Sequence, residues 1–405
     1  DSLLVNKGAA TANSRAVNAD GEGSVLLKAR AGNLDLQGQV IGSTGNVHLI
    51  ANNKVNVADS GNILMSDISG VINTTAKTVY AQADNAIIMT DGASILAAGG
   101  QVRLDAVNDI QLSQINTGSG SVALNTTAGQ VLDNQTPVTS TNIIADGLLI
   151  NSYNGVATTA NNLETTVNKL TVNSANGSVF MHDTTSVAID QVTVTVQEVS
   201  NAAVLSELTA TQSDVTTDAG AIVINAANSL TLNDGDTDGV AIQTTSGNVR
   251  LSTTVNTGQD VVINSAINLG SGNLSINTNR DIQQAAAGDI TSTAGTIDLV
   301  ATTGAITMTD GAVTQNDAGH IRYQAATNVQ LGLLDARTAA DRAATSLGDQ
   351  SSWGAVRVLA DSGNITAAAD GSNANVMANT LRLEAGSAIA TGANHIGTEV
   401  LTLAA

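Results

Sequence analysis

The chain contains no cysteine and a single proline, Pro137, in 405 residues. Without cysteine it has neither disulfides nor thiol chemistry. Secretion stays compatible with this composition, because disulfides are needed mostly by small domains with too little core. One proline leaves few breaks in backbone hydrogen bonding and argues against proline-rich linkers. The absences favour a chain that relies on regular backbone pairing.

Aromatic side chains are almost missing, although 42% of the residues are hydrophobic. A compact core of this size normally draws much of its buried area from aromatic rings. Here the apolar content is alanine, valine, isoleucine and leucine, which suits a narrow interior of stacked β-branched rows. The five aromatic residues are Trp353, Phe180, Tyr80, Tyr153 and Tyr323.

Basic residues are also scarce: 15 lysines and arginines stand against 35 aspartates and glutamates, for a formal charge of −20. This charge repels phosphate backbones and anionic membranes, so we expect no nucleic-acid partner. The apolar residues nowhere form an uninterrupted run long enough for a membrane span, so we expect a protein that does not span a membrane.

A short repeat, Gly-x-(Val/Ile/Leu)-x-apolar, recurs along the chain. The first copies begin at Gly23, Gly45, Gly100 and Gly120, and the later ones at Gly220, Gly247, Gly272, Gly295, Gly319 and Gly354. Close neighbours are 20 to 25 residues apart, as from Gly100 to Gly120 and from Gly247 to Gly272. A second alternating strand lies between copies, in 54–57, 109–112 and 328–331.

This pattern predicts an all-β fold, a right-handed parallel β-helix of about 18 coils, with residues 1–405 as one continuous β-helix. Alternation puts Val102, Leu104, Ile110 and Leu112 inside and Arg103 and Gln111 outside. We expect the glycine corners to supply the positive φ that a tight bend requires. Both ends fall within the repeating pattern, so we expect more β-helix in both directions.

A longer tandem repeat lies on top of the short one, with copies at approximately 81–172 and 300–405 and intervening coils at 173–299. Residues 88–93 recur as 307–312, and 148–172 aligns with 381–405. The second copy carries an insertion at 332–353. Long tandem modules are typical of extended repeat proteins, in which each module buries its end against the last.

The glycine-asparagine corners Gly45-Asn46, Gly247-Asn248, Gly272-Asn273 and Gly363-Asn364 resemble the repeats of filamentous-haemagglutinin-like bacterial exoproteins, as do 163–170, 396–403 and 177–183. The resemblance covers nearly the whole chain and is one of pattern and composition. It implies a two-partner-secreted adhesin of the cell surface or biofilm matrix, exported through an outer-membrane transporter. Its other implied partners are a surface or matrix polysaccharide, or further adhesin copies. The family's amino-terminal secretion motifs are absent here.

The best metal candidate is Asp234-Gly235-Asp236-Thr237-Asp238-Gly239, which has the opening of a calcium loop. Thr245 stands where the bidentate acid belongs, so we expect an acidic turn, with calcium bound by Asp234, Asp236 and Asp238 as the alternative. The dipeptides Asp91-Gly92 and Asp310-Gly311 predict turns. We expect no cofactor.

The four histidines, His48, His182, His320 and His395, are far apart in sequence. His48 and His320 flank inward positions, so we expect both to point outward into solvent. No pattern of paired nucleophile and base is present. A β-helical enzyme acting on polysaccharides would need a groove with aromatic platforms, which the composition disfavours.

The insertion at 332–353 is the most distinctive local feature. Its alanine-rich centre with spaced charges predicts a short helix or a lateral loop. Because specific contacts often sit on protrusions, it is a candidate contact element through Asp335, Arg337, Arg342 and Trp353, unless it only packs on the coils.

The sequence therefore predicts a non-enzymatic structural and adhesive segment of a giant secreted bacterial adhesin, mediating attachment or cell–cell aggregation. Two alternatives stay open. A polysaccharide-active β-helical enzyme would show a deep charged cleft with stacked aromatic rings. The shaft of a contact-dependent toxin would differ only by a terminal toxin domain.

Overall fold

The protein is a parallel β-helix. The computed structural model describes residues 2–6, 15–19, 21–54, 59–66, 72–254, 259–344, 348–369, 374–392 and 394–405. The chain divides into two compact units, described separately below. Unit 1 comprises Asp1–Thr184 and Gln191–Ser213, and unit 2 comprises Thr185–Asp190 and Asp214–Ala405.

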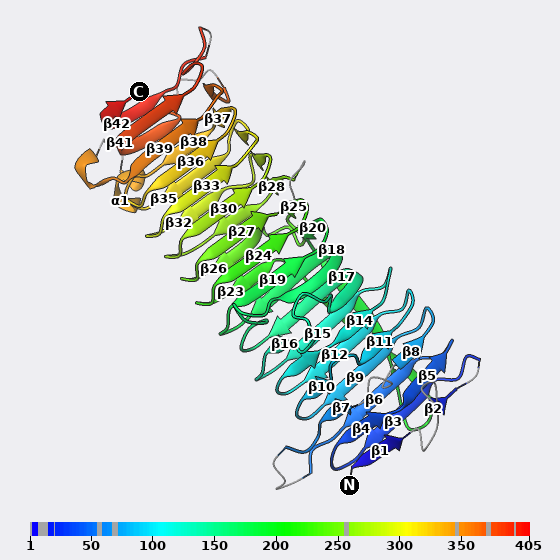
Figure 1. The fold of residues 1–405 in the computed structure, drawn as a ribbon. Coiled ribbons are helices and arrows are strands. Elements are labelled where there is room, and N and C mark those ends of the chain that lie inside the picture. Colours follow the sequence, from blue (N-terminus) through cyan, green and yellow to red (C-terminus); the bar gives the residue numbers. More distant parts are fainter. Residues whose placement is uncertain are drawn as a thin grey trace. The chain divides into compact units, whose positions relative to one another are not determined.

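Each coil contributes short strands to three rows, and each strand pairs in parallel with its equivalent one coil later (Figure 1). The register is regular: Val79 pairs with Val102, and Val102 with Val122. Residues at equivalent positions in successive coils therefore form columns, in which neighbours are separated by the strand spacing of about 4.8 Å. This geometry turns the sequence repeat into continuous columns of side chains.

The strands of unit 1 form these rows. The first row is β1 (Leu3–Asn6), β4 (Leu34–Gln37), β7 (Ile63–Met65), β10 (Ile87–Met89), β13 (Ile110–Leu112) and β16 (Val131–Asp133). The second is β2 (Arg15–Asn18), β5 (Gln39–Ser43), β8 (Ile72–Thr74), β11 (Ser94–Leu96) and β14 (Gln114–Asn116). The third is β3 (Val25–Ala29), β6 (Val47–Ala51), β9 (Val79–Ala83), β12 (Val102–Ala106) and β15 (Val122–Thr126). The long strands β17 (Ile143–Ser152) and β18 (Leu163–Ser174) continue the second and third rows, and β19 (Val179–Asp183) follows β18.

Unit 2 repeats the arrangement. Its first row is β20 (Val187–Ile189), β25 (Leu230–Leu232), β28 (Val261–Ile263), β31 (Ile282–Gln284), β34 (Ile306–Met308), β37 (Val329–Leu331) and β40 (Ile365–Ala367). The second is β23 (Val215–Thr217), β26 (Val240–Thr244), β29 (Ala266–Asn268), β32 (Ile290–Ser292), β35 (Val313–Asn316) and β38 (Leu333–Asp335). The third is β24 (Ile222–Ala226), β27 (Val249–Thr253), β30 (Leu274–Thr278), β33 (Ile297–Ala301), β36 (Ile321–Ala325) and β39 (Ala355–Ala360). The strands β41 (Val376–Ala385) and β42 (Thr398–Ala404) follow β40 in the chain.

The interior is the expected stack of small aliphatic side chains. Val102, Leu104, Ile110 and Leu112 are fully buried, and Arg103 and Gln111 lie on the other face of their strands, as predicted. Of the alternating segments between the glycine repeats, 109–112 and 328–331 form β13 and β37. Residues 55–57 of the third such segment lie outside the described residues.

The repeated glycines have a different role from the predicted one. Ten other described glycines have positive φ, among them Gly92 and Gly311 in the two expected Asp-Gly turns, but the motif glycines from Gly45 to Gly354 do not. Instead, eight of them are packed against the chain one coil earlier: Gly45, Gly100, Gly120, Gly247, Gly272, Gly295, Gly319 and Gly354. A Cβ added at Gly247 would lie 1.9 Å from the Gly220 carbonyl oxygen, and one at Gly272 would lie 1.9 Å from that of Gly247. The constraint at the motif is close approach of backbones, and not bending.

Hydroxyl side chains complete many corners. A serine or threonine turned inward donates to the carbonyl oxygen of the glycine three residues later, which satisfies a buried backbone acceptor. The donor–acceptor distances are 2.7 Å for Thr117–Gly120, 2.8 Å for Thr126–Gly129, 2.7 Å for Ser152–Gly155, 2.7 Å for Ser174–Gly177 and 2.6 Å for Thr217–Gly220.

The two copies of the long repeat have the same strand pairing. In the first copy β17 pairs with both β14 and β15, and then with β18. In the second copy β41 pairs with both β38 and β39, and then with β42. The sequence repeat is thus also a repeat of local structure.

Substitution of Gly247 by alanine tests the close approach between coils. We expect Gly247→Ala to lower the free energy of unfolding by about 1–3 kcal/mol, because the Gly220 carbonyl must move away. Gly392→Ala is the matched control, because a Cβ added at Gly392 would have no neighbouring atom within 4 Å and the φ of Gly392 is not positive. Urea denaturation of both variants measures the difference, and equal midpoints would contradict the packing described.

Candidate functional site

The outer face of unit 1 carries a β-hairpin that leaves the coil pattern. Its strands β21 (Val192–Val199) and β22 (Leu205–Gln212) are antiparallel, with Val192 opposite Gln212. They follow the coil residues Thr185–Asp190, yet they pack on unit 1. The alternating valines and threonines of 192–196 predicted no such excursion, because alternation identifies a strand but not its partner.

The inner side of this hairpin is apolar. Val192, Val194 and Val196 pack on Tyr80, Ala123 and Leu149, with Leu208 and Ala210 against the same cluster. Tyr80, Ala123 and Leu149 occupy the same outward position in β9, β15 and β17. Outward-facing apolar residues break the expected alternation, and this was the signal in the sequence that something covers them.

Side chains from successive coils bind the free backbone edge of β21. The Thr195 N–H donates to Gln101 Oε1 at 2.7 Å, and the Gln197 N–H donates to Thr78 Oγ1 at 2.9 Å. The Val199 N–H donates to His48 Nδ1 at 3.0 Å. Three coils thereby satisfy backbone donors that β22 does not reach, so the hairpin is fixed across them.

The prediction that His48 is exposed to solvent was wrong. Its side chain does point outward, but the hairpin covers it and leaves it 4% exposed. The ring stacks on Tyr80 with centroids 4.8 Å apart. Burial, the largest cause, lowers the pKa of His48 below its usual 6.5, so the neutral ring is favoured. His320 is exposed, as predicted.

The same outward column in unit 2 is charged. Asp298, Arg322, Arg357 and Arg382 are paired in register in successive coils, at the positions that Tyr80, Arg103, Ala123 and Leu149 hold in unit 1. The arginine side chains are 41%, 40% and 60% exposed in chain order. We call Arg322, Arg357 and Arg382 the arginine column.

Two carboxylates pair with this column. Arg322 binds Asp298 through two bonds of 2.6 and 2.7 Å. Glu384 lies 3.1 Å from Arg357 and 2.6 Å from Arg382. Three guanidinium groups therefore face two carboxylates, which leaves a local positive excess on a chain whose formal charge is −20.

The insertion at 332–353 contains the predicted short helix, α1 (Ala339–Ala343), and a 3₁₀ turn at Gln350–Ser352. Thr338 caps α1 by accepting the Asp341 N–H at 3.1 Å. Residues 345–347 lie outside the described part of the chain. The four residues predicted as contacts all have partners within this insertion or in the adjoining coil.

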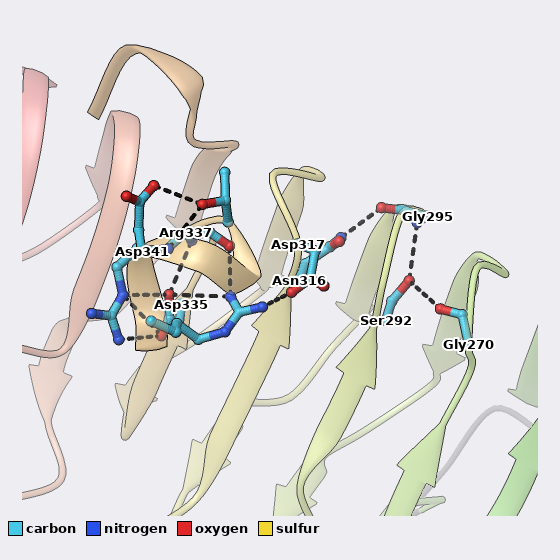
Figure 2. A network of polar contacts seen from close by, with 10 residues as sticks. Gly270, Ser292, Gly295, Asn316, Asp317, Asp335, Arg337 and Asp341 are labelled. Carbon is cyan, nitrogen blue, oxygen red and sulfur yellow. Dashed lines mark hydrogen bonds and ion pairs between the residues drawn. The ribbon is translucent and has the colours of Figure 1, made fainter. Parts of the chain in front are cut away.

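Figure 2 shows how these charges are satisfied. Asp335, 2% exposed, accepts from Arg337 Nη2 at 2.7 Å, and Arg342 Nη1 lies 3.7 Å from it. Arg342 also forms an ion pair with Asp317 and donates to the Arg337 carbonyl oxygen at 2.6 Å. Farther along the same edge, Asn316 Nδ2 donates to the Gly295 carbonyl oxygen and Ser292 Oγ donates to that of Gly270 (Figure 2).

The tryptophan is also engaged internally. Trp353 is 5% exposed, and its Nε1 donates to Asp341 Oδ2 at 2.7 Å. Partners inside the fold thus account for Asp335, Arg337, Arg342 and Trp353. This geometry favours an insertion that packs on the coils.

The acidic loop at 234–239 is held by its own backbone. Asp234 accepts the N–H groups of Thr237 at 2.7 Å and Gly239 at 3.1 Å, and Asp238 accepts that of Val240 at 2.8 Å. Asp236 and Asp238 lie close to Asp214, and ligand oxygens of these three fall within 4.8 Å of one another. Asp234 is outside that group, so the predicted set of three aspartates is not the set that the fold brings together.

Comparison with models of known families, with curated proteins and with solved structures finds no match. In the described parts of the chain, no helix has the length and apolar character needed to cross a membrane.

Replacing Val194 by aspartate tests the docking of the hairpin. Val194 is fully buried against the coils, whereas Thr193 is exposed on the opposite side of the same strand. We expect Val194→Asp to release the hairpin, because a buried unpaired charge is unfavourable. Limited proteolysis between Ser200 and Val204 should become much faster than in wild type, with Thr193→Asp as the control. Equal cleavage rates in the two variants would contradict the docking.

Acidification should loosen the same hairpin. Because the folded-state pKa of His48 is lowered, the unfolded chain takes up a proton first as the pH falls below 6.5. The stabilisation is therefore present above pH 6.5 and is lost below it. Glu198 and Lys28 are the charged groups that act on the ring. We expect faster cleavage of the hairpin at low pH, and a shallower pH dependence in His48→Gln. An equally steep profile in that variant would assign the effect to another group.

Proposed function

We propose that this chain is a structural and adhesive β-helix segment of a secreted bacterial surface or matrix adhesin. The observation that carries the proposal is the duplication: β11 to β18 and β35 to β42 repeat one arrangement of strands. Repetition suits a protein that builds length and presents the same face many times. Export through an outer-membrane transporter and a location on the cell surface belong to the same proposal.

The shape of the surface supports a binding role over an enzymatic one. A hollow of about 370 Å³ in unit 2 is lined by Gly311, Leu331 and Ala368, with Asp310 as the one carboxylate among its described residues. Tyr80, Tyr323 and Trp353 are buried and offer no stacking platform for a sugar, and Tyr153, 45% exposed, does not line this hollow. Glycoside hydrolysis ordinarily requires two carboxyl groups facing one substrate, which this hollow lacks among those residues.

The arginine column is the surface that we assign to attachment. Guanidinium groups bind carboxylates in planar, two-bonded pairs, and they keep their charge at all physiological pH values. Coils repeat at about 4.8 Å, which is comparable to the length of one sugar residue. An acidic polysaccharide lying across the coils can therefore bring carboxylates within reach of the arginine column.

Binding to a polyuronate tests this assignment. We expect the full chain to be retained on immobilised alginate and released by added salt, because exposed charge pairs are screened. The variant Arg322→Gln/Arg357→Gln/Arg382→Gln should lose at least tenfold in affinity. Arg250→Gln is the matched control, since Arg250 lies in the same column with Val223 and Ser275 as its uncharged neighbours.

Two outcomes would count against the proposal. Equal retention of the triple variant would remove the arginine column as the binding surface. Appearance of new reducing ends during incubation with polysaccharide would favour the alternative, a β-helical enzyme. Dextran, which is uncharged, should not be retained in either case.

A further inference from the structure

Two acidic residues of unit 1, Asp133 and Glu164, are covered: Asp133 is in register with the inward-facing Leu112, and Glu164 lies on an outward position. Leu163 and Thr165 are turned inward, so Glu164 between them faces outward, yet it is only 6% exposed. Asp133 ends β16 and is partly buried. An ionised carboxylate in such a place needs a compensating charge or hydrogen bonds.

One asparagine connects the two acids. Asn142, fully buried, donates through Nδ2 to Asp133 Oδ1 and accepts the Glu164 N–H through Oδ1 at 2.9 Å. A second asparagine, Asn161, donates through Nδ2 to the Asp133 carbonyl oxygen at 3.3 Å. The asparagines therefore hold Asp133 and Glu164 beside each other.

Three oxygens in this cluster have no hydrogen-bond donor. They are Asp133 Oδ2, Asn161 Oδ1 and Glu164 Oε2, and each is buried. All three are acceptors, so they cannot satisfy one another while both acids are ionised. Asn142 bonds the Asp133 carboxylate through Nδ2 and the Glu164 N–H through Oδ1, so the two acidic residues lie on either side of one amide group.

The second copy of the repeat has the same scaffold without the acids. Asn394 Nδ2 donates to the Ala367 carbonyl oxygen at 3.0 Å, as Asn161 does to that of Asp133. Asn375 Oδ1 accepts the Gly397 N–H at 3.0 Å, as Asn142 does that of Glu164. Ala367 and Gly397 thus stand where the first copy has its two carboxylates.

This comparison separates the fold from the acids. The asparagine hydrogen bonds form in both copies, so they belong to the folding of this coil. The carboxylates are present together in one copy and missing together in the other. Asn394 Oδ1, the counterpart of Asn161 Oδ1, is likewise buried without a donor in the second copy. The unfilled carboxylate oxygens Asp133 Oδ2 and Glu164 Oε2 are therefore what distinguishes the first copy, and they point to a positively charged ligand.

We propose that Asp133, Asn161 and Glu164 bind a divalent cation, with calcium as the ion that fits best. Calcium takes carboxylate and amide oxygens and accepts irregular arrangements of ligands, which suits loop-borne groups. The ion supplies the positive charge that the covered acids lack. The site is independent of the arginine column, which belongs to unit 2.

Calcium binding by the full chain tests the proposal. Above neutral pH, we expect thermal unfolding in millimolar calcium chloride to occur several degrees higher than in EDTA. Equilibrium dialysis with the metal alone should find calcium bound at a site that is lost in Glu164→Gln. In EDTA this variant should be at least as stable as wild type, because it removes an uncompensated charge. Magnesium should be the weaker ion, since it requires stricter octahedral geometry.

Two further variants make the result decisive. Asp133→Ala/Glu164→Gly installs the residues of the second copy, which the same scaffold already accommodates, and should abolish the calcium effect. Asp236→Asn/Asp238→Asn disrupts the separate acidic group of unit 2 and should leave this effect unchanged. The proposal is overturned if Glu164→Gln binds as much calcium as wild type, or if calcium never changes the unfolding temperature. It also fails if the effect disappears in the unit 2 variant.

Discussion

The distance between neighbouring coils is the constraint on which both units depend. Parallel pairing sets it at about 4.8 Å, and each corner must bring its backbone to the previous corner at that spacing. A side chain at the motif glycine does not fit, as the 1.9 Å approach between a Cβ at Gly247 and the Gly220 oxygen demonstrates. The aliphatic columns, the inward hydroxyls and the outward columns all follow from keeping this one spacing.

The period and the alternation were enough to predict the β-helix and the inside positions of residues such as Val102 and Leu104. The role of the glycines was predicted less well, because a sequence shows that a side chain is missing but not why. Positive φ and close backbone approach both require glycine, and only the three-dimensional structure shows which of the two applies. The hairpin was missed for a related reason: 192–196 has the pattern of a strand, while its partner surface is formed by residues far earlier in the chain.

Predictions about individual sites were limited in the same way. Asp234, Asp236 and Asp238 form a recognisable motif. However, Asp234 accepts backbone N–H groups of its own turn, and it is Asp214 that lies close to Asp236 and Asp238. The charges of the insertion satisfy one another around Asp335. Asp133 and Glu164 belong to no sequence motif. They are brought together by Asn142, which bonds both the Asp133 carboxylate and the Glu164 backbone, and their significance emerges only when Ala367 and Gly397 are compared with them.

The hairpin also imposes an order on the folding of unit 1. The outward apolar column at Tyr80, Ala123 and Leu149 is complete long before the residues that cover it, since Val192–Val199 comes later in the chain. A chain that emerges amino terminus first therefore holds an uncovered apolar stripe until the hairpin is available. Coils can add one at a time by local pairing, but this last step spans about 150 residues between His48 and Val199. Docking of the hairpin thus depends on contacts that are distant in sequence, and contacts of this kind generally slow folding.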